Sequence, residues 1–428
     1  MTEEGNNRGI VLCGVCKNVV STLPVIRAAF EELAAKAGVP CWAVFYENNS
    51  DDGTDAELMK WAAEAPDQVR VKCEKFTKEE ELSRCVARTC DNQPCRMERI
   101  AFARNKLLDM LEGGHASPLT PSSSGNYVPR TPPHQGTTFN TVAFGPDPLL
   151  IRELRAKRSA PPPFFSGELR SPNPSSGGKD TGKCNEGGVW GTVGSIPRYV
   201  VMIDMDNPVP FPVDAILKCI ARDPDGFDAL VCNGLNSAGY IYDTYAYRDA
   251  QFPFGPEIMR DVFWSGHHQY YMQTAVHNQT LFFNRQIKQN PARLPYIPIT
   301  SGFNGMCIFR WDAIMGGMRP PCDPLGNSID QPLRYSAVPT AELNAEYEAL
   351  YSIPPFSNTM VNGASVGIHL FPNDNDTPKD DNDKGIFYFH NSGYNFPVVC
   401  EHVPFFAAMR ARNRRRIYLC TDLVWNWI

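Results

Sequence analysis

The chain has 428 residues, of which 43% are hydrophobic and 21% are charged, with 41 basic and 47 acidic side chains. These proportions are ordinary for a globular protein, so they exclude a collagen-like, coiled-coil or wholly disordered chain. The net charge of −6 gives no basic surface for nucleic acid, so we expect no nucleic-acid partner. No apolar run is long enough to span a membrane, and the polar start lacks a signal-peptide pattern. We therefore expect a soluble, cytoplasmic protein, unless a longer natural chain carries an upstream anchor.

The N-terminal part alternates between strand-like and helix-like patterns. Residues 9–16 form a continuous apolar run, residues 23–37 have apolar side chains at helical spacing, and residues 41–46 form a second apolar run. A polar turn, a short helix and a strand at 69–72 follow, and a further helix is expected over residues 97–111. This strand–helix order predicts a parallel sheet with flanking helices.

Composition changes sharply in the middle of the chain. Residues 113–198 contain 13 Pro and 13 Gly, or 26 of 86 residues, against 43 of the other 342. Such a composition is typical of a loop-rich insertion, parts of which are disordered.

The sharpest chemical signal is Asp204-Met205-Asp206, which directly follows the apolar residues 199–203. Alternation along a strand puts the two carboxylates on one side of the chain. Ligands of open α/β sheets bind at the carboxyl ends of the strands, and two carboxylates there suit Mg²⁺ or Mn²⁺ shared with a diphosphate. The alternative is a solvated strand end that binds nothing.

A second polar segment, Glu47-Asn-Asn-Ser-Asp-Asp-Gly-Thr54, follows the strand expected at 41–46. Its acidic and amide side chains can accept hydrogen bonds from a nucleobase and a ribose. The alternative is an Asx-type turn that caps the next helix. The pattern alone does not decide between them.

Two further patterns also have alternative interpretations. Cys13 and Cys16 form a Cys-x-x-Cys pair, but the second pair that a zinc ribbon needs is missing. A thioredoxin-like redox pair is the alternative, but we expect both thiols to be reduced. The basic run from Arg410 to Arg416 is either a solvated helix end or a contact to an anionic acceptor or a membrane face.

Together the polar segments resemble those of a nucleotide-sugar glycosyltransferase of the GT-A fold. More narrowly, they resemble the fungal capsule-associated α-1,3-mannosyltransferase type and related viral, algal and bacterial enzymes. Three other stretches carry the resemblance: residues 99–106, residues 242–249, and residues 301–309 with the Cys-Glu-His at 400–402. It covers roughly residues 9–112 and 199–425, the insertion has no counterpart, and Tyr245 stands where the family pattern has Trp.

The resemblance implies a GT-A, Rossmann-like three-layer α/β/α sandwich with a mostly parallel central sheet and a long loop-rich insertion. Residues 1–112 would form the nucleotide-binding half, 113–198 the insertion, and 199–428 the half with the metal and acceptor sites. The implied enzyme moves a glycosyl group, with mannosyl as one option, from a nucleotide-sugar donor to a hydroxyl of a glycan or glycoconjugate acceptor. It would use Mn²⁺ or Mg²⁺. A catalytically silent GT-A-like protein that binds glycans or acts as a scaffold is the alternative.

The resemblance also assigns roles to individual residues. The expected metal ligands are Asp204, Asp206 and His402, and the expected donor contacts are Glu47, Asn49, Asp52, Arg99, Arg104 and Asn105. The expected acceptor or sugar contacts are Tyr242, Arg248, Asn304 and Gly305. The cation would stabilise the negative charge that develops on the leaving diphosphate.

An inverting enzyme also needs a base for the acceptor hydroxyl. Glu401 is the first candidate and Asp243 the second. The mannosyltransferase resemblance favours retention of configuration instead, so the stereochemistry stays open.

Overall fold

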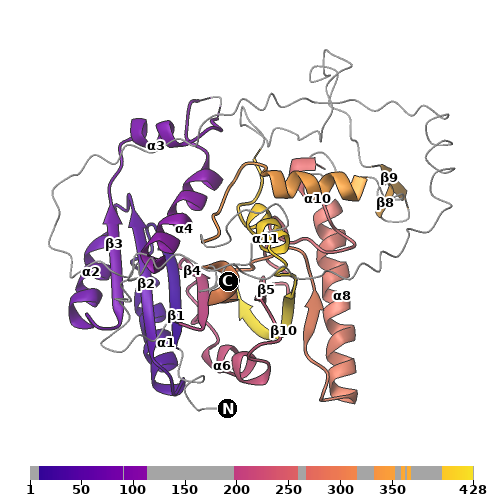
Figure 1. The fold of residues 1–428 in the computed structure, drawn as a ribbon, viewed down its shortest axis with the longest axis horizontal. Coiled ribbons are helices and arrows are strands. Elements are labelled where there is room, and N and C mark those ends of the chain that lie inside the picture. Colours follow the sequence, from indigo (N-terminus) through magenta and orange to yellow (C-terminus); the bar gives the residue numbers. More distant parts are fainter. Residues whose placement is uncertain are drawn as a thin grey trace, which may run out of the picture.

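Figure 1 shows the computed structural model of the chain. It describes residues 9–89, 91–112, 197–258, 267–315, 332–351, 358–361, 364–367 and 398–427. Within these ranges, no helix is both long enough and apolar enough to cross a membrane. Nearly all of the predicted insertion, residues 113–196, lies outside them.

An eight-stranded sheet runs through the centre in the order β3-β2-β1-β4-β7-β5-β10-β6. Its strands are β1 (Ile10–Cys16), β2 (Cys41–Asn48), β3 (Val69–Glu74), β4 (Tyr199–Asp204), β5 (Ala229–Leu235), β6 (Tyr296–Pro298), β7 (Met306–Arg310) and β10 (Ile417–Asn426). Six strands run in one direction, whereas β7 and β6 are antiparallel to their neighbours. The predicted α/β class with a mostly parallel sheet is therefore confirmed. A separate hairpin pairs β8 (Asn358–Val361) with β9 (Ala364–Gly367).

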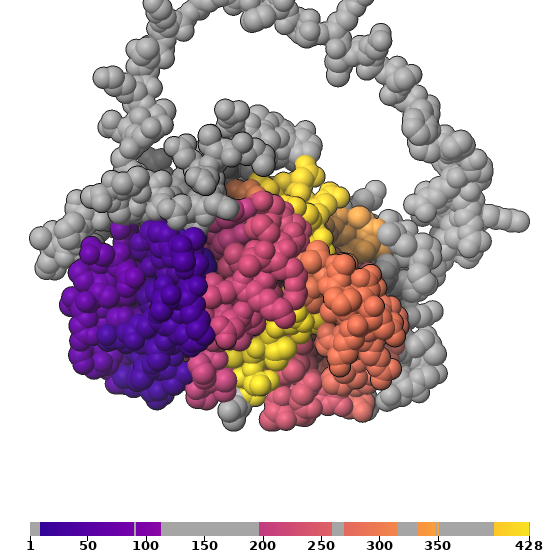
Figure 2. All heavy atoms as spheres, turned by 90° about the horizontal axis from the view of Figure 1, so that it is seen from below, coloured from indigo at the N-terminus to yellow at the C-terminus, as the bar shows by residue number. Residues whose placement is uncertain are grey.

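Helices cover both faces of this sheet (Figure 1). One apolar cluster joins it to α1 (Leu23–Lys36), α2 (Thr54–Glu64) and α6 (Val213–Arg222). The other joins it to α4 (Arg96–Glu112), α8 (His267–Gln289), α10 (Ala341–Tyr351) and α11 (His402–Ala411). The short helices α3 (Lys78–Arg84) and α9 (Trp311–Ile314) complete the described elements. Seen from below, residues 197–258 lie between the N-terminal part and residues 267–315 (Figure 2).

Alternation along β1 shows how the sequence builds these two layers. Ile10 and Leu12 pack into one cluster, whereas Val11 and Cys13 pack into the other. Cys16 lies in the first of these clusters, so Cys13 and Cys16 lie on opposite faces of the sheet. The Cys-x-x-Cys pair is therefore not arranged as a redox pair, and burial raises the pKa of both thiols.

The antiparallel strand β7 determines which segments meet at the carboxyl edge of the sheet. β4 ends at that edge with Asp204, and β7 begins there with Met306. The turn before β7 is thereby placed beside the end of β4, and the backbone N–H of Asp204 donates to the carbonyl of Gly305 at 2.8 Å. The polar segments that follow β2, β4 and β5 reach the same edge because these strands run in one direction.

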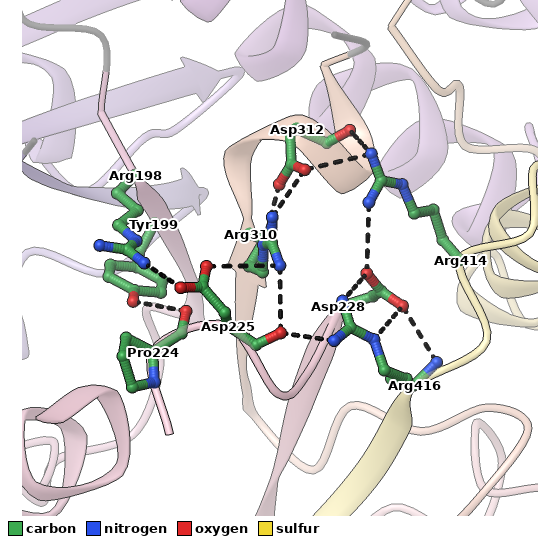
Figure 3. A network of polar contacts seen from close by, with 9 residues as sticks. All are labelled: Arg198, Tyr199, Pro224, Asp225, Asp228, Arg310, Asp312, Arg414 and Arg416. Atoms are coloured by element: carbon green, nitrogen blue, oxygen red, sulfur yellow. Dashed lines mark hydrogen bonds and ion pairs between the residues drawn. The ribbon is translucent and has the colours of Figure 1, made fainter. Parts of the chain in front are cut away.

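The opposite edge is closed by a network of arginines and aspartates (Figure 3). Asp228, just before β5, is buried and accepts hydrogen bonds from the backbone N–H and the guanidinium of Arg416, just before β10. Arg414 pairs with both Asp228 and Asp312.

Arg410, at the start of the basic run, makes separate contacts. It pairs with Glu346 and donates to the carbonyl of Thr300. These members of the basic run therefore hold neighbouring elements together.

This network gives a stability test with a matched control. Asp228→Ala should lower the free energy of unfolding by about 2–4 kcal/mol, because it removes several charge-assisted hydrogen bonds to a buried carboxylate. Asp225→Ala should cost under about 1 kcal/mol, although Asp225 pairs with Arg198 and Arg310, because its side chain is 69% exposed. Urea unfolding of both variants measures the difference, and equal losses would contradict the role given to Asp228.

Candidate functional site

The candidate site lies at the carboxyl edge of the sheet, around the end of β4. The side chain of Asp204 is 33% exposed, and Asp206, two residues later, is exposed. A hydrogen bond holds the backbone between them in place, because the hydroxyl of Thr22 donates to the carbonyl of Met205. Both carboxylates are thus accessible from solvent, while the strand that carries Asp204 is buried.

Arg104 links this strand end to two other elements. It extends from α4, where it is buried, and its Nη2 donates to Asp204 Oδ1 at 3.1 Å. Its Nε lies 3.3 Å from Oε1 of Glu401, the residue before α11. One guanidinium therefore joins carboxylates that are far apart in the sequence. Burial alone would lower the pKa of Arg104, but Glu401 and Asp204 raise it above its usual range.

Aromatic rings enclose that guanidinium. Arg104 lies over Phe303 at 4.3 Å and over Tyr335 at 5.6 Å from the ring centroids. The imidazole of His402 stacks on Phe303, with 4.1 Å between centroids. The ring of Tyr335 meets His402 edge-on at 5.5 Å. Such packing excludes water and fixes the direction of the charged group.

The site carries more negative than positive charge in its immediate contacts. The pKa of Asp204 is raised to about 7, mainly by burial; Arg104 lowers it, and the charges of Asp206, Asp243 and Glu401 add to the increase. The pKa of Glu401 is raised by burial and lowered by Arg104. Repulsion among carboxylates at one edge favours the arrival of a cation or of protons.

Asp243 belongs to the same group through the turn before β7. The side-chain amide of Asn304 donates to the carbonyl of Cys232 at 2.9 Å, and its oxygen accepts the N–H of Asp243 at 3.1 Å. One carboxylate oxygen of Asp243 accepts the N–H groups of Tyr245 and Ala246. Burial raises the pKa of Asp243, and these two hydrogen bonds oppose the shift. Asn304 therefore orients Asp243 rather than pointing to solvent.

The fit of a divalent cation can be tested on these residues. His402 is buried, burial lowers the pKa of its imidazole, and both of its nitrogens lack a hydrogen-bond partner in the described part of the chain. However, the described residues contain no group of three or more His, Cys, Asp or Glu side chains arranged to hold a metal. His402 is thus not brought together with Asp204 and Asp206 as predicted, because its ring is packed between Phe303 and Tyr335. The two aspartates fit a cation that completes its shell with water and phosphate oxygens, as Mg²⁺ commonly does.

The predicted donor segment after β2 forms a tightly bonded loop. Asp52 accepts the N–H groups of Val20 and Thr54 and the hydroxyl of Thr54. The side-chain amide of Asn49 accepts a hydrogen bond from the backbone N–H of Phe76 and donates one to its carbonyl. Glu47 is buried and accepts the N–H of Ser50 at 2.7 Å. The sequence left two options for Asp52, a donor contact or a turn before the next helix. In the structure its carboxylate forms the turn at the start of α2.

The two other predicted donor residues on α4 lie apart from each other. Arg99 pairs with Glu81 at 3.5 Å, and Glu81 also accepts the side-chain N–H of Asn49. Arg99 and Asn49 thus share Glu81 as a partner, and Arg99 and Glu81 line a small pocket near the end of β2. The side chain of Asn105 exchanges two hydrogen bonds with the backbone of Tyr335. It therefore positions the ring that packs on Arg104, and the predicted contact with the donor is replaced by this internal one.

Arg248 has a structural position instead of the predicted acceptor contact. Its guanidinium is buried and donates to both carboxylate oxygens of Glu257, at 3.1 and 3.0 Å. The hydroxyl of Tyr347 donates to the same carboxylate at 2.6 Å. A cation already enclosed in such a pair is not available to a ligand. The predicted acceptor contact of Arg248 is therefore replaced by its pair with Glu257.

Tyr242 and Gly305 lie at the edge of the site, and their predicted contact with the acceptor or a sugar stays a prediction. The ring of Tyr242 is 45% exposed and stacks on Trp427, with centroids 4.4 Å apart and an angle of 3° between the rings. Gly305 has φ +84°, and a Cβ there would lie 2.1 Å from the Trp427 ring. Sequence reasoning missed Trp427, Tyr335 and the contact role of Phe303, because no local pattern links them to the aspartates.

Comparisons of the sequence with known proteins complete the description of the site. No protein-family model matches the chain. No curated protein matches it either.

Proposed function

We propose that the protein is a metal-dependent glycosyltransferase that moves a sugar from a nucleotide-diphosphate donor to a hydroxyl of a glycan. The observation that carries this proposal is the placement of Asp204 and Asp206, accessible to solvent, at the carboxyl end of a central strand. Beside them lies a buried arginine that contacts two carboxylates. The resemblance in the sequence names the GT-A fold and the donor class, and the mixed α/β sheet is compatible with it.

Each group then has a chemical task. Asp204 and Asp206 would hold Mn²⁺ or Mg²⁺, which supplies positive charge to the departing diphosphate. Arg104 is buried and already pairs with Asp204 and Glu401, so it would position Asp204 for the cation instead of making the predicted donor contact itself. The loop from Glu47 to Asp52, with Arg99, would form the nucleoside side of the site.

On this geometry we prefer Asp243 to Glu401 as the base, which reverses the order expected from the sequence. Glu401 is buried and its Oε1 faces Arg104, so it is a positioning residue that orients the guanidinium. Asp243 is only half-buried and has one carboxylate oxygen outside the two backbone hydrogen bonds. A base must reach the proton that it abstracts. We therefore assign the base of an inverting reaction to Asp243.

The non-catalytic alternative has two observations in its favour. The described residues hold no group of three metal-ligating side chains, and Arg104 already pairs with Asp204. A glycan-binding protein that retains the fold could use Arg104 as a permanent counter-ion and need no cation. The two functions differ in whether a nucleotide sugar is consumed.

Release of nucleoside diphosphate from a panel of UDP- and GDP-sugars tests the proposal. We expect release with Mn²⁺ or Mg²⁺ and none with EDTA. Asp204→Asn and Asp206→Asn should each slow it by roughly a hundredfold or more, equivalent to about 2.7 kcal/mol in the barrier. Asp214→Asn on α6, an exposed acid paired with Lys36, is the matched control and should match the wild type. Consumption of no donor, or full activity in EDTA, would contradict the proposal.

The assignment of the base has its own test. Asp243→Asn should lower kcat by at least about a hundredfold and remove the acidic limb of the pH–rate profile. Glu401→Gln should have a smaller effect and keep that limb, because it acts through Arg104. If Glu401→Gln removes the limb and Asp243→Asn keeps it, the assignment is reversed. If both variants keep it, neither carboxylate is the base.

A further inference from the structure

An exposed aromatic surface lies beside the acidic group. Tyr242 is half-exposed although its ring is stacked on another aromatic ring, so one face packs on protein and the other meets solvent. Burial is the largest cause that raises the pKa of the Tyr242 hydroxyl. The negative charges of Asp206, Asp204 and Asp243 raise it too. The free face of the ring is therefore close to the carboxylates of the candidate site.

The layer beneath Tyr242 is buried and bonded to the sheet. Trp427 is only 9% exposed, and its backbone N–H donates to the carbonyl of Leu235 at 2.7 Å. It also packs on Trp425, with ring centroids 5.4 Å apart. On the same edge, the side chain of Asn207 donates to the carbonyl of Asn426 at 2.9 Å, which ties the end of β10 to the segment after Asp206.

Two further features concern the indole of Trp427. The indole N–H of Trp427 is buried without a hydrogen-bond partner there. The close approach of Gly305 to the same indole requires a glycine in a left-handed conformation. Any larger side chain at position 305 would displace the indole that supports Tyr242, so the stacked pair depends on this glycine.

We infer that Tyr242, supported by Trp427, is a stacking platform for a pyranose ring. A sugar ring presents a flat face of C–H groups that packs on an aromatic face, and its hydroxyls remain free to bond to the neighbouring carboxylates. The ring belongs either to the donor or to the acceptor, since both sugars must meet beside the cation. The inference rests on the proposed function for this choice of ligand, but the platform itself stands on the geometry of Tyr242 and Trp427.

Binding measured by calorimetry in Mn²⁺ separates these sources. The probes are GDP and UDP, GDP-mannose and UDP-glucose, and the methyl glycosides of mannose and glucose. The variants are Tyr242→Ala, which removes the platform, and Tyr242→Phe, which keeps the ring and removes the hydroxyl. Tyr270→Ala is the matched control, because Tyr270 on α8 is 60% exposed and makes no part of the site. Thermal melts check that each variant folds.

We expect Tyr242→Ala to weaken sugar binding about three- to tenfold, the range for an aromatic contact, while Tyr242→Phe and Tyr270→Ala bind like the wild type. Weaker binding of the nucleotide sugar with unchanged binding of the free nucleotide assigns the platform to the donor sugar. Weaker binding of the glycosides alone assigns it to the acceptor.

Three other results bear on the inference. An equal loss for free nucleotides and nucleotide sugars would overturn it, because the platform would then contact the nucleotide. Unchanged binding of every sugar by Tyr242→Ala, or no sugar binding by the wild type, would overturn it as well. Glycoside binding that depends on Tyr242, in a protein that binds no nucleotide, would support the platform and contradict the proposed function.

Discussion

The buried guanidinium of Arg104 is the interaction on which the candidate site depends. Carboxylates that are buried or close together are costly unless a cation compensates them, and this edge of the sheet gathers the buried Glu401 and the partly exposed Asp204 and Asp243. Arg104 contacts two of them from a third element, so α4, the end of β4 and the start of α11 are held in one arrangement. The aromatic rings on either side keep water away and strengthen the pairing. Among the described residues, no hydrogen bond or ion pair of the Asp206 side chain is seen, and Asp206 is exposed.

The direction of one strand explains why these residues meet. If β7 ran parallel to β4, the turn with Asn304 and Gly305 would lie at the opposite edge. Because β7 is antiparallel, the turn abuts Asp204 and also holds the backbone of Asp243 through Asn304. The C-terminal strand β10 then brings Trp427 against Gly305. The site is thus assembled from strand ends that are distant in the sequence.

Local patterns predicted much of the fold but less of the site. The apolar runs and helical spacing of the N-terminal part and of residues 199–235 correspond to observed strands and helices, since each pattern reports burial against the sheet. The spacing of apolar residues did not predict helix α8, because its sequence is mostly polar. Arg104 and Arg248 look alike in the sequence, yet Arg104 joins two carboxylates at the site and Arg248 is enclosed by Glu257. Such pairings depend on partners distant in the chain, which no local pattern specifies.

Direct binding of Mn²⁺ tests the central claim, that Asp204 and Asp206 form a cation site shared with a diphosphate. Free Mn²⁺ gives a sharp paramagnetic resonance spectrum that is lost on binding. The account predicts that the protein with GDP or UDP removes this signal, and that the variant carrying both Asp204→Asn and Asp206→Asn does not. A signal that persists with the wild-type protein and both nucleotides, or that the double variant removes equally well, would contradict it.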